Sequence, residues 1–260
     1  MQIKTSARAA NSEIKDIMPK INLFHSDALT LCKNLPDNSI DLIYTDPPYN
    51  TGKRQSVTTS SNSYRDIHAD FKSFIYPILS EFKRIAANHA TVAVHLDHRE
   101  VHYAKVWMDE IFGREKFQGE IIWESLLGNH RKDYWAIKHT TILMYCKGNP
   151  RFNPEYVPKI MKYDGVNEST IKSVWRYTLS NTHPERLSYP NQKPEAIVEN
   201  FVLANTNKGD WCLDPFAGSG TLGRVAFDNN RNCILGDLNI QSIDTINRSR
   251  LPISKFRSLL

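Results

Sequence analysis

The tetrapeptide Asp46-Pro47-Pro48-Tyr49 has the residue types most suited to chemistry in this sequence. Two prolines fix φ and remove two backbone donors, so acceptor groups dominate a stiff turn. The Asp46 carboxylate and the Pro47 carbonyl would accept hydrogen bonds from an exocyclic amine, and Tyr49 would stack on its ring. The turn follows an apolar run at 40–45, and ligands of open α/β sheets bind at the carboxyl ends of strands. Alternatively, the turn only caps a strand and Tyr49 is ordinary packing.

A second motif, LDPFAGSGTLG at 213–223, places a glycine-rich turn between a short apolar run and a helical stretch. Gly218, Gly220 and Gly223 satisfy G-x-G-x-x-G, which lets a ligand approach the backbone at a helix N-terminus. A dehydrogenase-type dinucleotide site is the rival interpretation. Only the last 40 residues follow Gly220, too few to complete such a sheet. The rest of the sheet must therefore come from the N-terminal part of the chain, which predicts a circularly permuted order.

Short β-rich apolar runs alternate with stretches of helical period, which predicts an α/β fold. The expected strands are 21–24, 40–45, 90–96, 117–123, 140–146, 211–214 and 232–236. The expected helices are 27–34, 70–87, 100–112, 193–205, 220–229 and 239–249. No helix separates strands 117–123 and 140–146, so we expect an antiparallel pair at one edge of an otherwise parallel seven-stranded sheet.

Over roughly residues 20–250 the chain resembles the β-class amino DNA methyltransferases. Asp46–Tyr49 is similar to their motif IV and Asp214–Thr221 to their motif I. Residues 189–194, YPNQKP, resemble the QKP signature before motif I, and 25–28, HSDA, the site of an early acid. The resemblance implies a circularly permuted, Rossmann-like methyltransferase fold with one antiparallel strand. The chain departs from the family at Leu222, often a second Thr, and at Ser26, often a Gly.

The resemblance implies methyl transfer from S-adenosylmethionine to N6 of adenine in duplex DNA, with the base flipped from the helix. The implied catalytic residues are Asp46, Pro47, Pro48 and Tyr49. Asp27 would bind the adenine amino group of the cofactor, Asp237 its ribose, and Lys193 its carboxylate. The full implied cofactor set is Asp27, Gln192, Lys193, Asp214, Phe216, Ala217, Gly218, Ser219, Gly220, Thr221 and Asp237.

Other functions compete with this one. An N4-cytosine DNA methyltransferase would use the same chemistry, although cytosine enzymes more often carry Ser in place of Asp46. Protein-glutamine enzymes usually show Asn there, and an RNA substrate stays open. A catalytically silent DNA-binding subunit is the alternative from another class, but both motifs are intact.

The segments 50–69, 124–138 and 150–190 lack periodicity, and loops this long are usually functional or mobile. Within them Lys53, Arg54, Arg131 and Lys132 are candidate DNA contacts, and an aromatic near Arg131 could wedge or stack. A solvated surface loop explains the same residues. His98 and His102 stand at metal-ligand spacing, but methyl transfer needs no metal and none is expected.

The composition fits one globular domain over residues 1–260, with a polar extension at 1–20 and candidate target-recognition segments at 124–138 and 150–188. The net charge of +5 is compatible with a polyanionic partner. Four scattered cysteines predict buried thiols, and with no signal or membrane segment evident we expect a cytoplasmic protein of prokaryotic or phage origin. The resemblance also leaves room for a homodimer.

Overall fold

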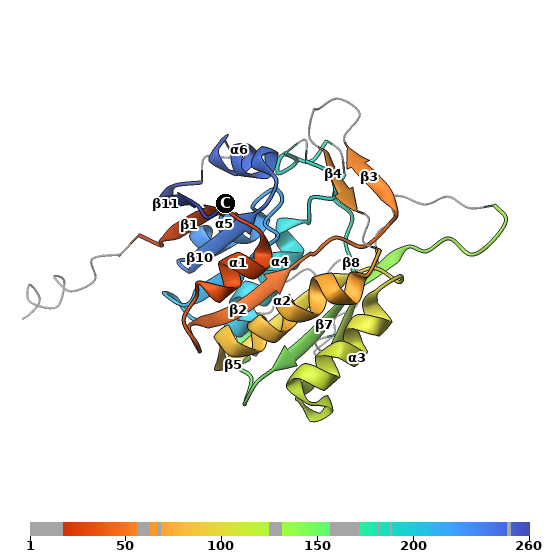
Figure 1. The fold of residues 1–260 in the computed structure, drawn as a ribbon, viewed down its shortest axis with the longest axis horizontal. Coiled ribbons are helices and arrows are strands. Elements are labelled where there is room, and N and C mark those ends of the chain that lie inside the picture. The colour runs from red at the N-terminus through yellow and green to blue at the C-terminus, as the bar shows by residue number, and fades with distance from the viewer. Residues whose placement is uncertain are drawn as a thin grey trace, which may run out of the picture.

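In the computed structural model, the described residues between 18 and 260 form an α/β domain around one large sheet (Figure 1). The structure describes residues 18–56, 63–66, 69–124, 132–156, 172–180, 182–187, 189–248 and 251–260. Most of the predicted extension at 1–20 lies outside these residues. Among the described helices, none is both long and apolar enough to cross a membrane.

Within the described residues the sheet has nine strands in the order β11-β1-β10-β9-β2-β5-β7-β6-β8. Only β7 runs antiparallel to its neighbours, β5 and β6. The strands are β1 (Ile21–His25), β2 (Ile40–Thr45), β5 (Ala86–Leu96), β6 (Phe117–Glu124), β7 (His139–Cys146), β8 (Val174–Arg176), β9 (Trp211–Asp214), β10 (Asn232–Asp237) and β11 (Ile253–Ser258). A separate hairpin joins β3 (Lys53–Ser56) to β4 (Ser63–Asp66).

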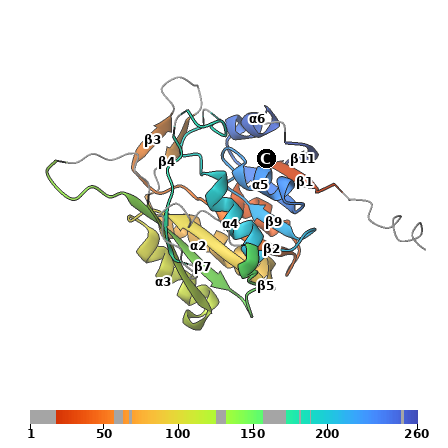
Figure 2. The ribbon, with the colours of Figure 1, turned by 180° about the vertical axis from the view of Figure 1, so that it is seen from behind.

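Helices cover both faces of the sheet and make two cores. Figure 1 shows α1 (Ala28–Lys33), α2 (Phe71–Ile85) and α3 (Val101–Phe112) over one face. Figure 2 shows α4 (Glu195–Asn205) and α5 (Thr221–Asp228) over the other, where α6 (Ile240–Arg248) also packs. Short 3-10 turns lie at 114–116 and 154–156.

The sequence explains this layering. In β2, Ile43 faces the α1–α3 core, whereas Leu42 and Tyr44 face the α4–α6 core, so successive side chains serve opposite layers. Helix α2 is capped at its N-terminus by Asp70, whose carboxylate accepts the Ser73 N–H at 3.0 Å. Its buried residues then recur at helical spacing: Phe71, Ile75, Ile78, Leu79, Phe82 and Ile85.

All seven predicted strands and six predicted helices are present, with a single antiparallel strand as expected. The differences are additions. Strands β8 and β11 extend the sheet at its two edges, so the predicted pair β6–β7 lies just inside one edge. β11 is mostly exposed and charged and β8 has three residues, so neither has the apolar pattern that predicts a strand.

The sheet brings two distant turns together. β2 and β9 are parallel neighbours, with Leu42 opposite Cys212 and Ile43 opposite Leu213. The Thr45 hydroxyl donates to the Asp214 carboxylate at 2.9 Å, although 169 positions separate them. The turn after Thr45 and the turn after Asp214 therefore open at the same carboxyl edge.

The turn from β9 to α5 depends on glycine at two positions. Gly218 and Gly220 have φ of +52° and +82°, a region that side chains with a Cβ rarely adopt. At Gly220 an added Cβ would also lie 2.8 Å from Ile246 Cγ1, whose side chain is fully buried. Both backbone strain and close packing by α6 thus require glycine here.

We therefore expect Gly220→Ala to lower the free energy of unfolding by about 2–4 kcal/mol, from the positive φ and the forced movement of Ile246. Urea denaturation would measure the loss. Gly209→Ala is the matched control, because Gly209 has φ of +87° with open space around it, and should cost only about 1 kcal/mol. Equal losses at the two positions would contradict the packing argument.

Candidate functional site

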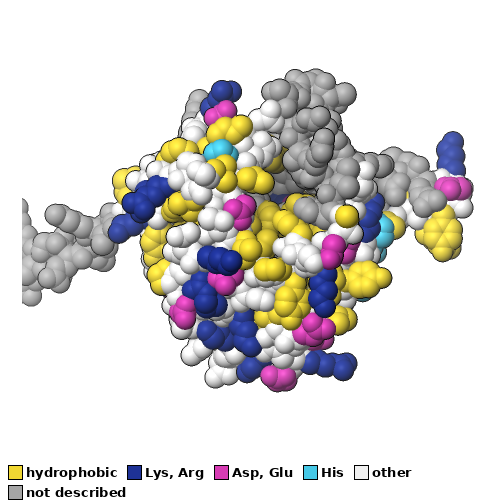
Figure 3. All heavy atoms as spheres, viewed as in Figure 1, with side chains coloured by type: hydrophobic (Ala, Val, Ile, Leu, Met, Phe, Trp, Pro, Cys, Tyr) yellow, Lys and Arg dark blue, Asp and Glu magenta, His cyan; other side chains and the backbone are white. Residues whose placement is uncertain are grey.

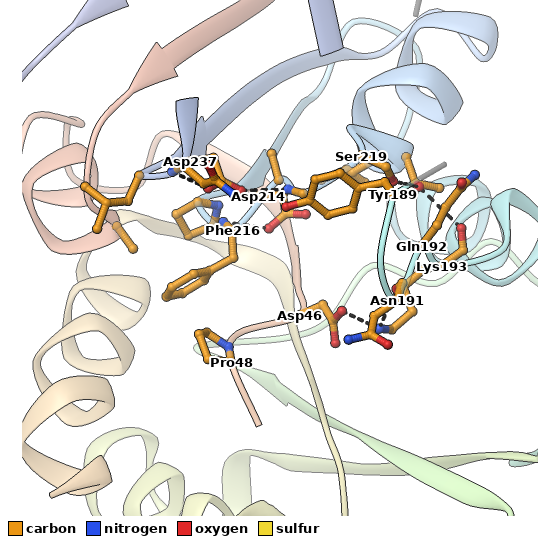
Figure 4. A pocket seen from close by; sticks show the side chains of 18 of the residues that line it. Asp46, Pro48, Tyr189, Asn191, Gln192, Lys193, Asp214, Phe216, Ser219 and Asp237 are labelled. Atoms are coloured by element: carbon orange, nitrogen blue, oxygen red, sulfur yellow. Dashed lines mark hydrogen bonds and ion pairs between the residues drawn. The ribbon is translucent and has the colours of Figure 1, made fainter. Parts of the chain in front are cut away.

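A cavity of about 440 Å³ opens at the carboxyl edge, between the ends of β2, β9 and β10. One side is polar, with Asp46, Lys193 and the glycine turn, and the other is apolar (Figure 4). Of the residues predicted to act on cofactor or base, those that line it are Asp27, Asp46, Pro48, Gln192, Lys193, Asp214, Phe216, Ala217, Gly218, Ser219, Thr221 and Asp237. Residues from five separate segments, at 27, 46–48, 192–193, 214–221 and 237, thus meet in one cavity.

Asp46 and Lys193 form an ion pair within this cavity, and Figure 4 shows their side chains pointing toward one another. Lys193 is only 8% exposed. Its Nζ donates to Asp46 Oδ2 and, at 3.2 Å, to the Asn191 carbonyl. The Tyr49 hydroxyl donates to the other Asp46 oxygen, and Lys193 Nζ lies 5.2 Å from the centre of the Tyr49 ring. Asp46, predicted to bind the target amine, and Lys193, predicted to bind the cofactor, are therefore partners in one ion pair.

The glycine turn is tied to β10 through Asp237. The backbone N–H groups of Gly218 and Asn239 donate to its two carboxylate oxygens at 2.9 and 2.8 Å. Burial raises the pKa of this carboxyl, which the hydrogen bonds only partly offset. Since a carboxylate has about four acceptor positions, Asp237 can still accept from a diol at the cavity wall.

Asp214 lies under the turn and is almost completely buried. Burial raises its pKa to about 7, against the lowering effect of the hydrogen bonds from Phe216 N–H and the Thr45 hydroxyl. The nearby carboxylates of Asp46 and Asp237 contribute to this rise in the pKa. This carboxyl therefore changes charge near neutral pH.

The charges on the described cavity wall are unequal. Four carboxyl groups line it, from Asp27, Asp46, Asp214 and Asp237, and Lys193 is the one cation among the lining residues. Such a wall favours a ligand that carries positive charge. A ligand carboxylate would have Lys193 as its partner.

The apolar part of the wall comes from Pro48, Phe74 and Phe216. Phe74 and Phe216 meet edge to face, with ring centres 6.0 Å apart. Asp27, at the end of this side, caps α1 by accepting the Thr30 N–H at 2.8 Å. Burial raises the pKa of its carboxyl, but the hydrogen bonds from Thr30 and Leu29 outweigh that effect and lower it. Aromatic and proline side chains beside a carboxylate are suited to a planar heterocycle that carries an amino group.

Three predicted cofactor residues bond to the protein itself in this structure. The Gln192 amide accepts from Leu187 N–H and donates to the Glu185 carbonyl, both at 2.7 Å, so it orders the turn before α4. The Ser219 and Thr221 hydroxyls lie 3.0 Å apart, and Thr221 also donates to the Lys193 carbonyl. Gln192 therefore supports the wall, while the hydroxyls remain at the cavity surface.

His95 is a site residue that the sequence did not single out. It is fully buried at the end of β5, with Nδ1 4.0 Å from an Asp46 oxygen and Nε2 2.6 Å from the Thr140 hydroxyl. Burial, aided by the charge of Lys193, holds its pKa well below the usual value, so the ring is neutral. Trp123 packs edge-on against it, with ring centres 5.5 Å apart.

Phe74 was missed as well, and Tyr189, although part of the quoted segment 189–194, was given no role. Tyr189 bonds the Ser242 hydroxyl at 2.7 Å and packs against Gly218, where an added Cβ would lie 3.2 Å from its ring. Its place beside the QKP segment was the available signal. Phe74 is one more apolar residue of helical period, and His95 one polar residue at a strand end, so neither pattern predicts a site.

Of the predicted DNA contacts, the structure describes the side chain of Lys132 and the backbone of Lys53 and Arg54, and none of these residues is among those that line the cavity. Lys53 and Arg54 are on β3, opposite Asp66 and Arg65 in the hairpin. Arg131 falls outside the described residues. Lys132 is exposed in the segment that leads into β7.

One group of potential metal ligands occurs among the described residues: Asp41, His89 and Asp210. It lies at the amino ends of β2 and β9, far along the strands from the cavity. Asp41 already accepts from Trp211 N–H and lies 2.8 Å from His89, and Asp210 pairs with Arg151. These contacts explain the cluster as a link between strands.

Known proteins resemble this chain in sequence and in structure. A type II methyltransferase of Haemophilus parainfluenzae, M.HpaI, is 32% identical over 232 residues, covering 85% of this chain and 71% of the relative. The DNA adenine methyltransferase YhdJ of Escherichia coli strain K12 is 27% identical over 245 residues, covering 85% and 79%.

Two solved structures share the fold. The M1.HpyAVI–SAM complex gives a TM-score of 0.63 at 22% identity, covering 88% of this chain and 98% of that one. The cytosine-N4-specific PvuII DNA methyltransferase gives 0.68 at 16% identity, covering 92% and 95%. The expectation of a methyltransferase-type α/β fold is confirmed.

A family model described as DNA methylase (N6_N4_Mtase) matches residues 40–248. That span runs from the strand before Asp46 to the end of α6. It therefore contains the turn Asp46–Tyr49, the glycine turn after Asp214, and the ion pair between Asp46 and Lys193. The match confirms the resemblance seen in the motifs. The chain belongs to the DNA methylase family.

Proposed function

We propose that this protein transfers a methyl group from S-adenosylmethionine to N6 of adenine in duplex DNA. The observation that carries the proposal is the position of Asp46, whose carboxylate is on the wall of the same cavity as the glycine turn. An amine held by Asp46 therefore stands next to whatever that turn binds. Family membership supplies DNA as the substrate.

The cavity residues suit the proposed cofactor. S-adenosylmethionine, when bound, supplies an electrophilic methyl group on a positively charged sulfur. The cavity's four carboxyl groups favour that positive charge, and Lys193 offers a partner for the methionine carboxylate. Phe216 and Phe74 would hold the adenine ring, Asp27 its amino group, and Asp237 the ribose hydroxyls. The backbone of Ala217, Gly218 and Gly220 would form the floor.

Asp46 and Pro47 act on the target amine. Its lone pair is delocalised into the ring, so the nitrogen is a poor nucleophile. Hydrogen bonds from the amino group to the Asp46 carboxylate and the Pro47 carbonyl favour a pyramidal nitrogen with an available lone pair. Positioning then supplies most of the rate, because the proton leaves readily once the nitrogen is methylated.

The Tyr49 ring offers a stacking face for the flipped base, whose extrusion costs a few kcal/mol. Both Asp46 oxygens already accept hydrogen bonds, one from Tyr49 and one from Lys193. The amine therefore has to use a remaining acceptor position of the carboxylate or replace one of these donors. We assign that exchange to Lys193, which can turn from Asp46 to the cofactor's carboxylate.

Adenine is favoured over cytosine by the family resemblance, because cytosine enzymes more often carry Ser at the position of Asp46, and by the name of the E. coli relative, a DNA adenine methyltransferase. An N4-cytosine enzyme is the second candidate, and the PvuII structure shows that the fold serves that base too. A silent DNA-binding subunit is disfavoured because both motifs converge on a cavity. Residues 124–138 and 150–188 are proposed to read the target sequence, with Lys53, Arg54, Arg131 and Lys132 on phosphates.

Cellular location and assembly are proposals of the same kind. All four cysteines are free and buried, which suits a reducing compartment, so we infer a cytoplasmic enzyme of a bacterium or phage. A homodimer stays a prediction from family resemblance.

Methyl transfer from labelled S-adenosylmethionine to mixed-sequence duplex DNA tests the function, with digestion to nucleosides and mass identification of the product. We expect N6-methyladenine. Asp46→Ala should lower the rate at least a hundredfold, the scale on which loss of one preorganised polar group slows a reaction. Asp46→Asn, which keeps an acceptor oxygen, should lose less.

Cofactor binding, measured by calorimetry, is the control and should persist in both variants. N4-methylcytosine as the product would overturn the base assignment and keep the mechanism. Unchanged methylation in Asp46→Ala would refute the role of the turn.

Lys193→Gln tests the exchange. Loss of the charge should weaken binding of S-adenosylmethionine about 10- to 100-fold, because truncating one partner of a buried charge pair is costly. Methylthioadenosine, which lacks the methionine carboxylate, should bind the variant within about threefold of wild type. Equal losses for the two compounds in calorimetry would show that Lys193 acts only through the fold.

Asp214 gives a pH-dependent prediction. Its folded-state pKa of about 7 exceeds the ordinary 3.8, so the folded protein binds an extra proton between those pH values. Its contribution to stability is therefore fully present below about pH 4 and is lost as pH rises through 7. Asp214→Asn, neutral throughout, should gain on the order of 4 kcal/mol relative to wild type between pH 4 and pH 8.

Urea unfolding of the cofactor-free proteins across this range measures the difference. Parallel stability profiles for the two proteins would contradict the raised pKa. As a second readout, wild-type affinity for the cationic cofactor should rise through pH 7, and that of the variant should not.

A further inference from the structure

Trp135 is the most exposed large hydrophobic side chain among the described residues, with 83% of its surface open to solvent. It lies in the segment 132–138 that leads into β7, next to Tyr134, which is 70% exposed. A ring of this size contributes nothing to the core from such a position. Exposed aromatic side chains of this kind mark binding surfaces.

The segment joins the sheet at the carboxyl ends of the parallel strands, where the candidate site lies. β7 starts beside the end of β5, where Thr141 pairs with Leu96, and Thr140 pairs with Trp123 of β6. Trp135 is four residues before the first residue of β7 and can stand up to about 14 Å beyond it. Figures 1 and 2 both show the chain before β7, in green, extending away from the body of the protein.

The base of this segment is joined to the site by contacts. Thr140 lies 2.6 Å from His95 Nε2, and Trp123 packs on the same ring. His95 in turn lies 4.0 Å from Asp46. β6 and β7 pair along most of their length. The segment 132–138 and the residues that contact His95 are therefore parts of the same two-stranded ribbon.

The side chains of the segment suit nucleic acid. Lys132 and Lys138 flank the two aromatic residues, and Asp133 is the single acid between them. Figure 3 shows hydrophobic, basic and acidic side chains of this segment standing out together from the body. In proteins that bind nucleic acid, cationic side chains contact phosphates while neighbouring aromatic rings stack on bases.

We propose that Trp135 inserts into the duplex beside the target base and stacks in the space that the flipped base leaves. This inference rests on the proposed function and deepens it, because it names the residue that offsets the loss of stacking. The upper limit of about 14 Å on this reach exceeds the roughly 8.5 Å depth of the major groove, so the length of the segment allows the ring to arrive at the base stack.

Single-turnover methylation tests the proposal, after the target sequence has been read from methylated plasmid DNA. Two duplexes are compared: one with the target paired, and one with the target opposite an abasic site, where the base is already unpaired. We expect Trp135→Ala to slow methylation of the paired target about 10- to 100-fold, the range for loss of one base–aromatic stack. On the unpaired target the rate should return to within about threefold of wild type.

Trp135→Phe, which keeps a ring, should be intermediate on the paired target. Phe256→Ala is the matched control, because Phe256 is 51% exposed on β11 at the opposite edge of the sheet, and it should match wild type. Sedimentation velocity on each variant reports its oligomeric state.

Equal rates for wild type and Trp135→Ala on the paired target would overturn the inference alone. So would an equal loss on both duplexes, which would place Trp135 in general DNA affinity, or a loss explained by dissociation of a dimer, which would make it a protein contact. A wild type that methylates neither duplex would overturn the proposed function itself and is distinguishable from all of these.

Discussion

The pairing of β2 with β9 is the constraint on which the site depends. Each strand ends in a turn that does little by itself: one presents acceptors and an aromatic ring, the other a glycine backbone at a helix start. The Leu42–Cys212 and Ile43–Leu213 register sets these turns at the same level, and the Thr45–Asp214 hydrogen bond joins them where the strands end. Because the two halves of the site come from distant parts of the chain, the complete site requires β2 and β9 to be paired.

Electrostatics then decides what the cavity can hold. Burial disfavours carboxylates, and the pKa values of Asp214 and Asp237 rise for that reason. Backbone N–H groups from the glycine turn and its neighbours partly compensate this cost. A cation in the cavity would compensate it further. The same carboxyl groups that lower the stability of the empty fold at neutral pH therefore favour a positively charged ligand, which is a trade between stability and function.

Much of this was predictable from the sequence, for physical reasons. The strands that form the centre of the sheet are continuous apolar runs, so β2 and β9 were predicted correctly. The motif turns carry residues with a fixed backbone role, and the structure brings the turns around Asp46 and Gly218 to one cavity. Edge strands have no such pattern: β11 reads as polar and β8 is too short. His95 and Phe74 enter the site through packing of β5 and α2, which no local spacing encodes. The Asp46–Lys193 pair also required coordinates, because 147 positions separate the two residues.

The neutral state of His95 bears on how a base is recognised. A protonated ring beside Asp46 would compete with the target amine for that carboxylate, and burial prevents this. Tyr49, His95 and Trp123 then form a run of uncharged aromatic rings next to one acceptor. Such surroundings offer stacking and neutral hydrogen bonds. The proposed hydrogen bond to the Asp46 carboxylate would accept the amino group of adenine or of cytosine equally. Discrimination between the two bases must therefore come from the space available to one ring or two, and from contacts to ring nitrogens rather than to the amine.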